Sequence, residues 1–237
     1  YRRETFQEHV KRMLRVFEQP FFDREQARAC LPLREELAYT ARRLEGSYGW
    51  PAGILDRLGR LLIALHDIGK LDRRWQHWAH RWQEQVGKLR GEDLAISEGY
   101  MAAHTDYDMQ DEGEQALSRQ LRGLKPNHAV ESARAAEDVI WEATREPGLL
   151  RVGLSVIARH HSAGAVGTHG PFKAAPHAPD ALRGVLAKAQ IDALHDQFEA
   201  GTLSGKLVRA SRWPEILPYL LLCRSLRLAD QRSQRVR

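Results

Sequence analysis

The stretch LIALHDIGKLDRRWQ, residues 62–76, joins an apolar run directly to groups that could do chemistry. The run ends at Leu65; His66 and Asp67 follow at once, then Gly69 and Lys70. An adjacent imidazole and carboxylate can bind a divalent metal ion, and a nearby lysine can bind phosphate. The alternative is a helix that leaves the core and meets water.

Further histidines and one aspartate occupy similar places, each at or near the end of an apolar helical stripe. The ordered set is His9, His66, Asp67, His128, His160, His161 and Asp230. One such histidine alone is typical of a hydrogen-bonded core residue, whereas a buried carboxylate needs a cation or a metal as its partner. Imidazoles and carboxylates that converge in a helical bundle form a site for a first-row metal. The set as a whole therefore predicts a metal centre.

Helical periodicity supplies the elements that must position these side chains. Apolar or small residues recur at intervals of three and four over 6–17, 54–65, 129–143, 153–157 and 216–228. Gly69 and the pair Pro147-Gly148 are plausible helix stops. The absence of sustained period-two alternation argues against a sheet. We therefore predict an all-α fold, a helical bundle around a central metal site, with no internal repeat.

Two segments interrupt the helical pattern. Residues 105–115, TDYDMQDEGEQ, are acidic and polar, and we expect a mobile surface loop there. Residues 162–180 are rich in Gly, Ala and Pro, and we expect a second mobile loop, since a loop of that length is usually functional or disordered.

Three tryptophans form one helical stripe. Trp75, Trp78 and Trp82 stand at i, i+3 and i+7, with Arg73, Arg74 and Arg81 between and beside them. Such rings and guanidinium groups could stack against single-stranded bases. The alternative is a core or docking face, which is the commoner use of a tryptophan stripe.

Composition sets broad limits. The chain has 237 residues, of which 43% are hydrophobic, so a sizeable core can form, and no apolar run approaches a membrane span. Cys30 and Cys223 stand apart, which argues against structural zinc and for a reducing cytoplasm. The net charge of +5 suits an anionic partner, although the excess of arginine over lysine also fits a GC-rich genome. Because the chain begins at Tyr1, we expect a piece of a longer protein; without a Walker A motif it cannot itself be a motor.

Four local motifs carry a family resemblance. They are HDIGKLDRRWQ, NHAVES, ARHHSAG and LRLADQRSQ, in the order that runs from His9 to Asp230. This order resembles the HD-domain superfamily of metal-dependent phosphohydrolases, and most closely the HD nuclease domain of the CRISPR type I nuclease-helicase, which works with the Cascade surveillance complex. Two features depart from that pattern: a long insertion near 90–126 that contains His104, and Gln231 where the family often has Arg.

The resemblance implies a two-metal centre. One metal would be held by His9, His66, Asp67 and Asp230, and the other by His128, His160 and His161. Asp67 would bridge, since a carboxylate offers two oxygens and a neutral imidazole one free nitrogen. The nitrogen-rich ligand set favours two divalent transition metals, Mn²⁺, Fe²⁺, Co²⁺ or Ni²⁺, over Mg²⁺.

Three other residues receive expectations. Lys70 would stabilise negative charge on the reacting phosphorus, or would simply be a cation at a helix C-terminus. Ser132 would contact a phosphate or orient His128, or would only pack. His104 could supplement a ligand, but the favoured interpretation of its surroundings is a solvated acidic loop, so that His104→Ala should do little.

The leading interpretation is one HD nuclease domain over 1–237 that cleaves single-stranded DNA in the cytoplasm. Its partners would be a helicase domain or subunit and a Cascade-type complex. The alternative is an HD nucleotide phosphohydrolase that acts on dNTPs or cyclic nucleotides. A helical interaction module with a degenerate site is a third interpretation, against which the intact ligand set argues.

Overall fold

The computed structural model describes residues 2–97, 99–211 and 213–236, and helices account for most of them. The helices are α1 (Phe6–Glu18), α2 (Leu33–Tyr48), α3 (Ile54–Leu65), α4 (Arg73–Arg90), α5 (Glu112–Leu121), α6 (Ala129–Ala135), α7 (Glu137–Thr144), α8 (Pro147–Ala158), α9 (Ala178–Arg183), α10 (Lys188–Asp192) and α11 (Trp213–Ser233). Three 3₁₀ turns join them: η1 (Ile68–Leu71), η2 (Arg122–Leu124) and η3 (Ser204–Lys206). The predicted all-α fold class is confirmed.

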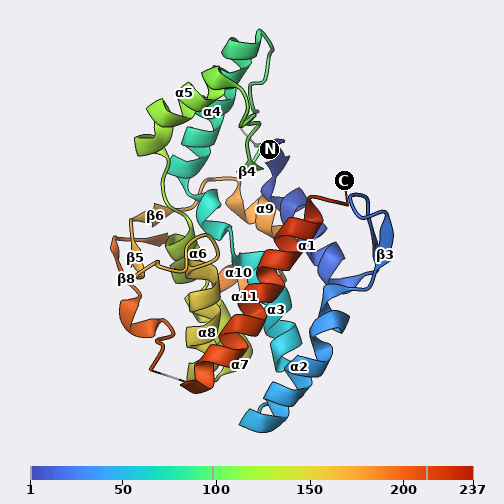
Figure 1. The fold of residues 1–237 in the computed structure, drawn as a ribbon. Helices are drawn as coiled ribbons and strands as arrows, with labels where there is room; N and C mark the ends of the chain where they lie inside the picture. The colour runs from blue at the N-terminus through green and yellow to red at the C-terminus, as the bar shows by residue number, and fades with distance from the viewer. Residues whose placement is uncertain (1, 98, 212, 237) are drawn as a thin grey trace.

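The main body is a bundle in which α11 runs diagonally across α1, α3 and α8 (Figure 1). Helix α3 lies at its centre, and all five residues from Leu61 to Leu65 are at most 5% exposed. A helix that is apolar nearly all round has to be surrounded by other helices. Because α3 is buried along its length, the polar residues that follow its last turn also begin inside the protein.

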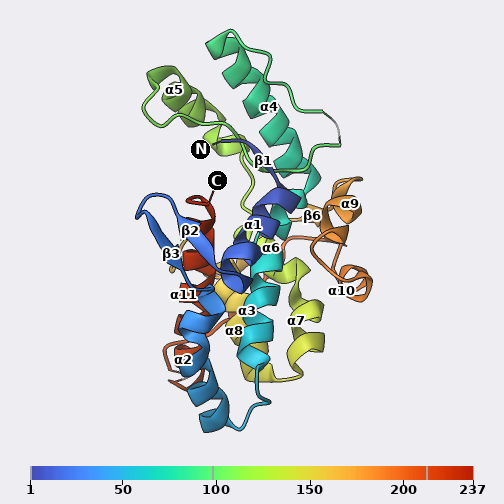
Figure 2. The ribbon, with the colours of Figure 1, turned by 90° about the vertical axis from the view of Figure 1, so that its right-hand side faces the viewer.

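Helices α4 and α5 project from one end of the bundle (Figures 1 and 2). They enclose a second, smaller apolar cluster made of Trp75, Trp78, Ala79, Trp82, Val86, Ala102, Leu117 and Leu121. The tryptophan stripe is therefore part of a core, with Trp75 2%, Trp78 8% and Trp82 3% exposed. The core interpretation of this stripe is confirmed, because the rings pack against one another and share a cluster with Leu117 and Leu121 of α5.

The prediction of a loop over residues 105–115 is wrong for residues 112–115, which are helical. Helix α5 begins at Glu112, and the Asp111 side chain caps it by accepting a hydrogen bond from the Glu114 backbone N–H. Glu114 is 2% exposed and pairs with Arg90 of α4 at 2.7 Å. Asp111 is thus a helix cap, and Glu114 is an ion-pair partner. The role of Glu114 depends on a contact with α4 that composition does not reveal.

The strands occur in antiparallel pairs, and no larger sheet forms among the described residues. The pairs are β1 (Glu4–Thr5) with β4 (Ala102–His104), β2 (Phe21–Asp23) with β3 (Arg28–Cys30), β5 (Thr168–His169) with β8 (Gly201–Thr202), and β6 (Phe172–Lys173) with β7 (Gln197–Phe198). Two of these strands and the start of α9 lie within 162–180, where we expected one long loop. That expectation is wrong because Phe172 stacks on Phe198 and is buried, whereas the mobility of the segment stays a prediction.

The strand pair β1–β4 connects the insertion near 90–126 to the start of α1. In this pair Glu4 lies opposite His104. Helix α1 itself begins with a capping box, in which Thr5 Oγ1 accepts from the Glu8 N–H and Glu8 Oε2 accepts from the Thr5 N–H. None of the described helices combines the length and the apolar character needed to cross a membrane.

Candidate metal centre

Two histidines follow the ends of two buried helices and are held there in the same way. His66 caps α3, and its Nδ1 lies 2.9 Å from the carbonyl oxygen of Ile63. His160 follows α8, and its Nδ1 lies 2.6 Å from the carbonyl oxygen of Ile157. A carbonyl can only accept, so Nδ1 carries the proton in both rings and Nε2 keeps its lone pair. That is the tautomer in which Nε2 can bind a metal.

The short link after His66 depends on glycine. Gly69 lies so close to the first turn of α6 that a Cβ there would overlap the carbonyl oxygen of His128. Its N–H donates to Ser132 Oγ at 2.8 Å, and the Ser132 hydroxyl donates to the His128 carbonyl at 2.7 Å. Gly69 and Ser132 therefore fix the distance between the HD pair and His128.

Ser132 does not lie where a substrate contact would require. Its side chain is 0% exposed, and its hydroxyl is used by Gly69 and His128. The expectation that Ser132 touches a phosphate is corrected: its position is structural, beneath His128.

The two oxygens of Asp67 face two different sets of imidazoles. Oδ2 lies 3.2 Å from His66 Nε2 and 3.6 Å from His9 Nε2. Oδ1 lies 3.2 Å from His128 Nε2 and 3.5 Å from His160 Nε2. The geometry groups these ligand atoms as two sets that share Asp67, one with His9 and His66 and one with His128, His160 and His161.

The remaining two predicted ligands complete the arrangement from its open side. His161 Nε2 lies 2.9 Å from His128 Nε2, so both nitrogens point to the same place. Asp230, near the end of α11, lies further out: its Oδ1 is 3.9 Å from His9 Nε2 and its side chain is 47% exposed. All seven predicted ligands are thus brought together, with Asp230 at the rim.

The donor atoms fit a bound cation. Asp67 Oδ1 and His160 Nε2 are buried, and neither forms a hydrogen bond within the described parts of the chain. A buried carboxylate oxygen and a buried imidazole nitrogen without partners are costly. Both are metal ligands by chemical type, and a divalent cation between them would satisfy both.

The electrostatics of the site keep these ligands in the forms that bind metal. Burial alone would raise the pKa of Asp67, but the neighbouring His66, the ammonium of Lys70 and the imidazoles of His128 and His160 hold it well below its usual range. Burial lowers the pKa of His128 to about 4. Burial, together with the neighbouring His160 and His128, lowers the pKa of His161 to about 2. At neutral pH the carboxylate is therefore charged, and His128 and His161 are neutral.

Lys70 lies inside the site and is not a surface cation at a helix end. It is 5% exposed, and its Nζ lies 2.7 Å from Asp67 Oδ2. The ammonium also lies 5.7 Å from the centroid of the Trp75 ring. The turn η1 brings it back toward the carboxylate, because a 3₁₀ turn places residues i and i+3 on the same side.

Sequence reasoning missed a buried glutamate at the site. Glu4 is 3% exposed, and its Oε1 lies 2.9 Å from Nδ1 of His9 and 2.7 Å from Nδ1 of His104. The rings of His9 and His104 meet edge to face with centroids 4.7 Å apart. The interpretation of His104 as part of a solvated loop is wrong, since its side chain is 21% exposed and burial is the main cause that lowers its pKa to about 2.

Gln76 holds the insertion near 90–126 next to η1, the turn that carries Lys70. Its side-chain amide donates to the carbonyls of Lys70 and Ala102 at 2.7 and 2.9 Å, and its Oε1 accepts from the Ala102 N–H at 2.9 Å. Through these bonds α4 ties η1 to β4, which carries His104. In the sequence, the one indication of this role was that Gln76, a polar residue, stands next to Trp75 of the tryptophan stripe.

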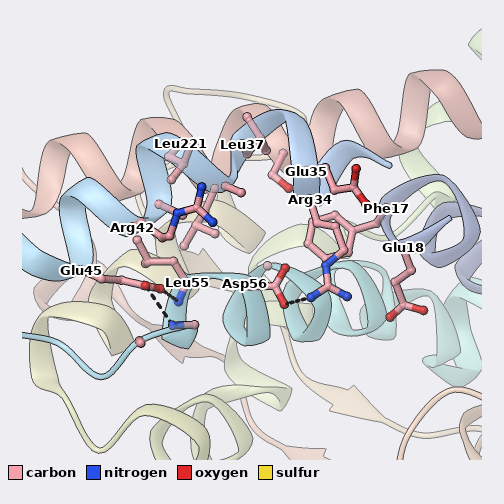
Figure 3. Close-up of a pocket in the computed structure, with 17 residues that line it drawn as sticks. Phe17, Glu18, Arg34, Glu35, Leu37, Arg42, Glu45, Leu55, Asp56 and Leu221 are labelled. Atoms are coloured by element: carbon pink, nitrogen blue, oxygen red, sulfur yellow. Dashed lines mark hydrogen bonds and ion pairs between the residues drawn. The ribbon is translucent and has the colours of Figure 1, made fainter. Parts of the chain in front are cut away.

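A groove of about 590 Å³ leads away from the histidines. Its lining includes residues of the candidate centre, Lys70, His104, His128, His161 and Asp230, together with Trp78, Tyr107, Arg122 and Lys125. A second cavity, of about 430 Å³, lies among α1, α2, α3 and α11, toward the other end of α3 (Figure 3). Several of its polar groups are paired: Arg34 pairs with Asp56 at 2.9 Å, and Glu45 accepts from the Gly53 and Leu55 N–H groups.

The fold and the site define a class of protein, the helical metal-dependent hydrolases with an HD pair at a helix end. The family described as "Cas3, HD domain" matches residues 25–215, and the chain belongs to it. It is accordingly a CRISPR-associated HD nuclease domain, which confirms the resemblance drawn from the motifs. The matched range contains the five central ligands but neither His9 nor Asp230. A search of curated proteins and a search of solved structures found no match to this chain.

Proposed function

We propose that this domain is an endonuclease that hydrolyses phosphodiester bonds in single-stranded DNA during CRISPR interference. The observation that carries the proposal is Asp67, whose two oxygens face two imidazole sets next to a groove with cationic side chains. Two cations that share one carboxylate suit the in-line displacement of a phosphodiester.

In this proposal His9, His66, Asp67 and Asp230 hold one metal, and His128, His160 and His161 hold the other with Asp67 as the bridge. The bound pair would supply activation of water and charge stabilisation of the phosphoryl oxygens. Mn²⁺, Fe²⁺, Co²⁺ or Ni²⁺ should serve better than Mg²⁺, because five of the seven ligands are imidazoles.

The chain's own residues prepare the site. The carbonyls of Ile63 and Ile157 fix the tautomers of His66 and His160, and Glu4 accepts from His9. Lys70 sets a positive charge beside Asp67, where it can stabilise a phosphate in the transition state.

The partners remain as the motifs predicted them: a helicase domain or subunit that exposes the strand, and a Cascade-type complex that selects the DNA. The cytoplasm is the compartment in which we expect them to meet. The alternative activity, hydrolysis of dNTPs or cyclic nucleotides, is kept as an outcome of the test, because the groove volume also suits a small molecule.

The test is incubation of chelated, metal-reloaded protein with circular single-stranded DNA, circular duplex DNA and dNTPs. We expect linearised and then fragmented single strands, intact duplex and little release of phosphate from dNTPs. A circle has no ends, so its cleavage requires endonuclease action. Mg²⁺ should support less cleavage than Mn²⁺, Co²⁺, Ni²⁺ or Fe²⁺. Rapid hydrolysis of dNTPs with intact circles would establish the alternative, and cleavage of duplex at the single-strand rate would contradict the substrate class.

A further inference from the structure

The groove carries an excess of positive charge. Its charged lining residues, apart from histidine, are Lys70, Arg122, Lys125 and Asp230. Lys70 and Asp230 belong to the candidate metal centre. The other two are cations from the turn that follows α5: Arg122 in η2 and Lys125 directly after it.

These two cations have no carboxylate within ion-pair distance in the parts of the chain that the structure describes. Two other basic residues of α4 are paired: Arg90 with Glu114 at 2.7 Å, and Arg74 with Asp72 at 3.0 Å. Lys125 instead lies over an aromatic face, with its Nζ 4.6 Å from the centroid of the Trp78 ring. The face of an aromatic ring attracts a cation, but the N–H groups of the lysine remain able to donate to another acceptor.

The surroundings of Lys125 favour an anion beside it. Burial lowers the pKa of Lys125 and the positive charge of Lys70 acts in the same direction, whereas the negative charge of Asp67 opposes them. A ligand with negative charge in the groove would offset both effects.

We propose that Arg122 and Lys125 form a phosphate-binding subsite for the phosphate next to the scissile one on a single strand. The proposal rests on the proposed nuclease function and goes beyond it, because it assigns strand recognition to the insertion. A small diester at the metal centre has no flanking phosphate to place here, whereas a strand does. Contacts of this kind position the strand without reading its sequence.

The test compares two substrates and two sets of variants. Arg122→Ala, Lys125→Ala and the double variant are assayed beside Arg119→Ala, an exposed arginine of α5 that does not line the groove. The substrates are a single-stranded oligonucleotide and bis(4-nitrophenyl) phosphate, a diester with no flanking phosphate. Binding of a labelled oligonucleotide to the metal-free proteins is measured by fluorescence anisotropy over a range of salt concentrations, and thermal melting checks that each variant is folded.

We expect the double variant to raise the KM for the oligonucleotide about tenfold or more, with unchanged hydrolysis of the small diester. Each lost phosphate contact should also reduce the magnitude of the slope of log K against log salt by about 0.7, the value for a single strand. Lys125→Arg should restore most of the binding, and Arg119→Ala should behave as the wild type.

Equal losses on both substrates, or wild-type oligonucleotide binding by the double variant, would overturn the subsite. Failure of the nuclease function is distinguishable from this. A wild-type protein that cleaves no DNA with any metal, yet binds the oligonucleotide through Arg122 and Lys125, would reject the proposed reaction and leave the subsite supported.

Discussion

Glu4 Oε1 lies 2.9 Å from Nδ1 of His9, so a carboxylate at the end of β1 orients a histidine in the first turns of α1. The same oxygen lies 2.7 Å from Nδ1 of His104 in β4. Because a carboxylate accepts the Nδ1 proton, His9 presents Nε2 toward Asp67 and Asp230. The strand pair β1–β4 therefore acts on the metal centre through the tautomer of one ring.

The first prediction concerns this contact. Glu4→Ala should weaken metal binding at the His9 side by about 10- to 100-fold, the range typical when the partner of a metal-binding histidine is removed. Metal titration of the chelated protein measures the affinity, and Glu4→Gln, which keeps an acceptor oxygen, should retain more of it. Glu35→Gln, at an exposed position of α2, is the control. Unchanged affinities in Glu4→Ala would show that Glu4 has no part in positioning His9.

The second prediction separates the two ligand sets. Asp67→Ala should lose both metals and all turnover, because Asp67 is the residue that the sets share. His128→Ala or His161→Ala should lose one metal and keep the other at least in part. Metal content by mass spectrometry and initial rates of cleavage are measured for each variant. The control is His177→Ala, because His177 does not line the groove. Two metals retained by Asp67→Ala would contradict the shared-ligand assignment.

The third prediction concerns Lys70. Lys70→Ala should keep both metals but lower kcat by about 10²- to 10³-fold, since a positioned donor to transition-state charge is removed. Lys88→Ala, an exposed lysine of α4, should leave kcat unchanged. The structure adds a second readout, because Lys70 Nζ also lies 2.7 Å from Asp67 Oδ2. Loss of a metal in Lys70→Ala would mean that the lysine acts by orienting Asp67 instead.

The fourth prediction is a pH dependence of stability in the metal-free protein. Burial is the largest cause that lowers the pKa of His104 to about 2, of His128 to about 4 and of His161 to about 2, each from 6.5. Each of these histidines has a pKa of 6.5 in the unfolded chain and a lower one in the folded protein. Between the two pKa values the unfolded chain binds more protons than the folded one. The free energy of unfolding should therefore fall as pH drops below about 6.5 and continue to fall toward pH 4.

Urea unfolding at pH 7.5, 6.5, 5.5 and 4.5 measures this slope. The variant His161→Gln should show a shallower decline than the wild type, because it removes one proton-binding group from the unfolded chain. His177→Gln is the control, since His177 is partly exposed. A free energy of unfolding that stays constant between pH 7.5 and 4.5 would show that these imidazoles are solvated.

The sequence by itself predicted helices at α1, α3, α8 and α11 and the candidate ligands at or near their ends, but it did not predict α2 or α5. His66 and Asp67 continue the apolar row of α3, and His160 continues that of α8, so the 3.6-residue period alone places them inside. The carbonyls that fix His66 and His160 are three residues earlier in the same chain segment, and such local contacts follow from helix geometry.

Only the tertiary structure decided what surrounds those ligands. Glu4 and His104 are 100 residues apart in the chain, and the pair of two- and three-residue strands that joins them has no periodicity to detect. The tryptophans of α4 are buried because α5 covers them, and Arg122 and Lys125 border the groove because the same insertion folds back toward His128. Contacts between distant segments depend on how whole helices pack, and the local sequence of neither partner encodes that packing.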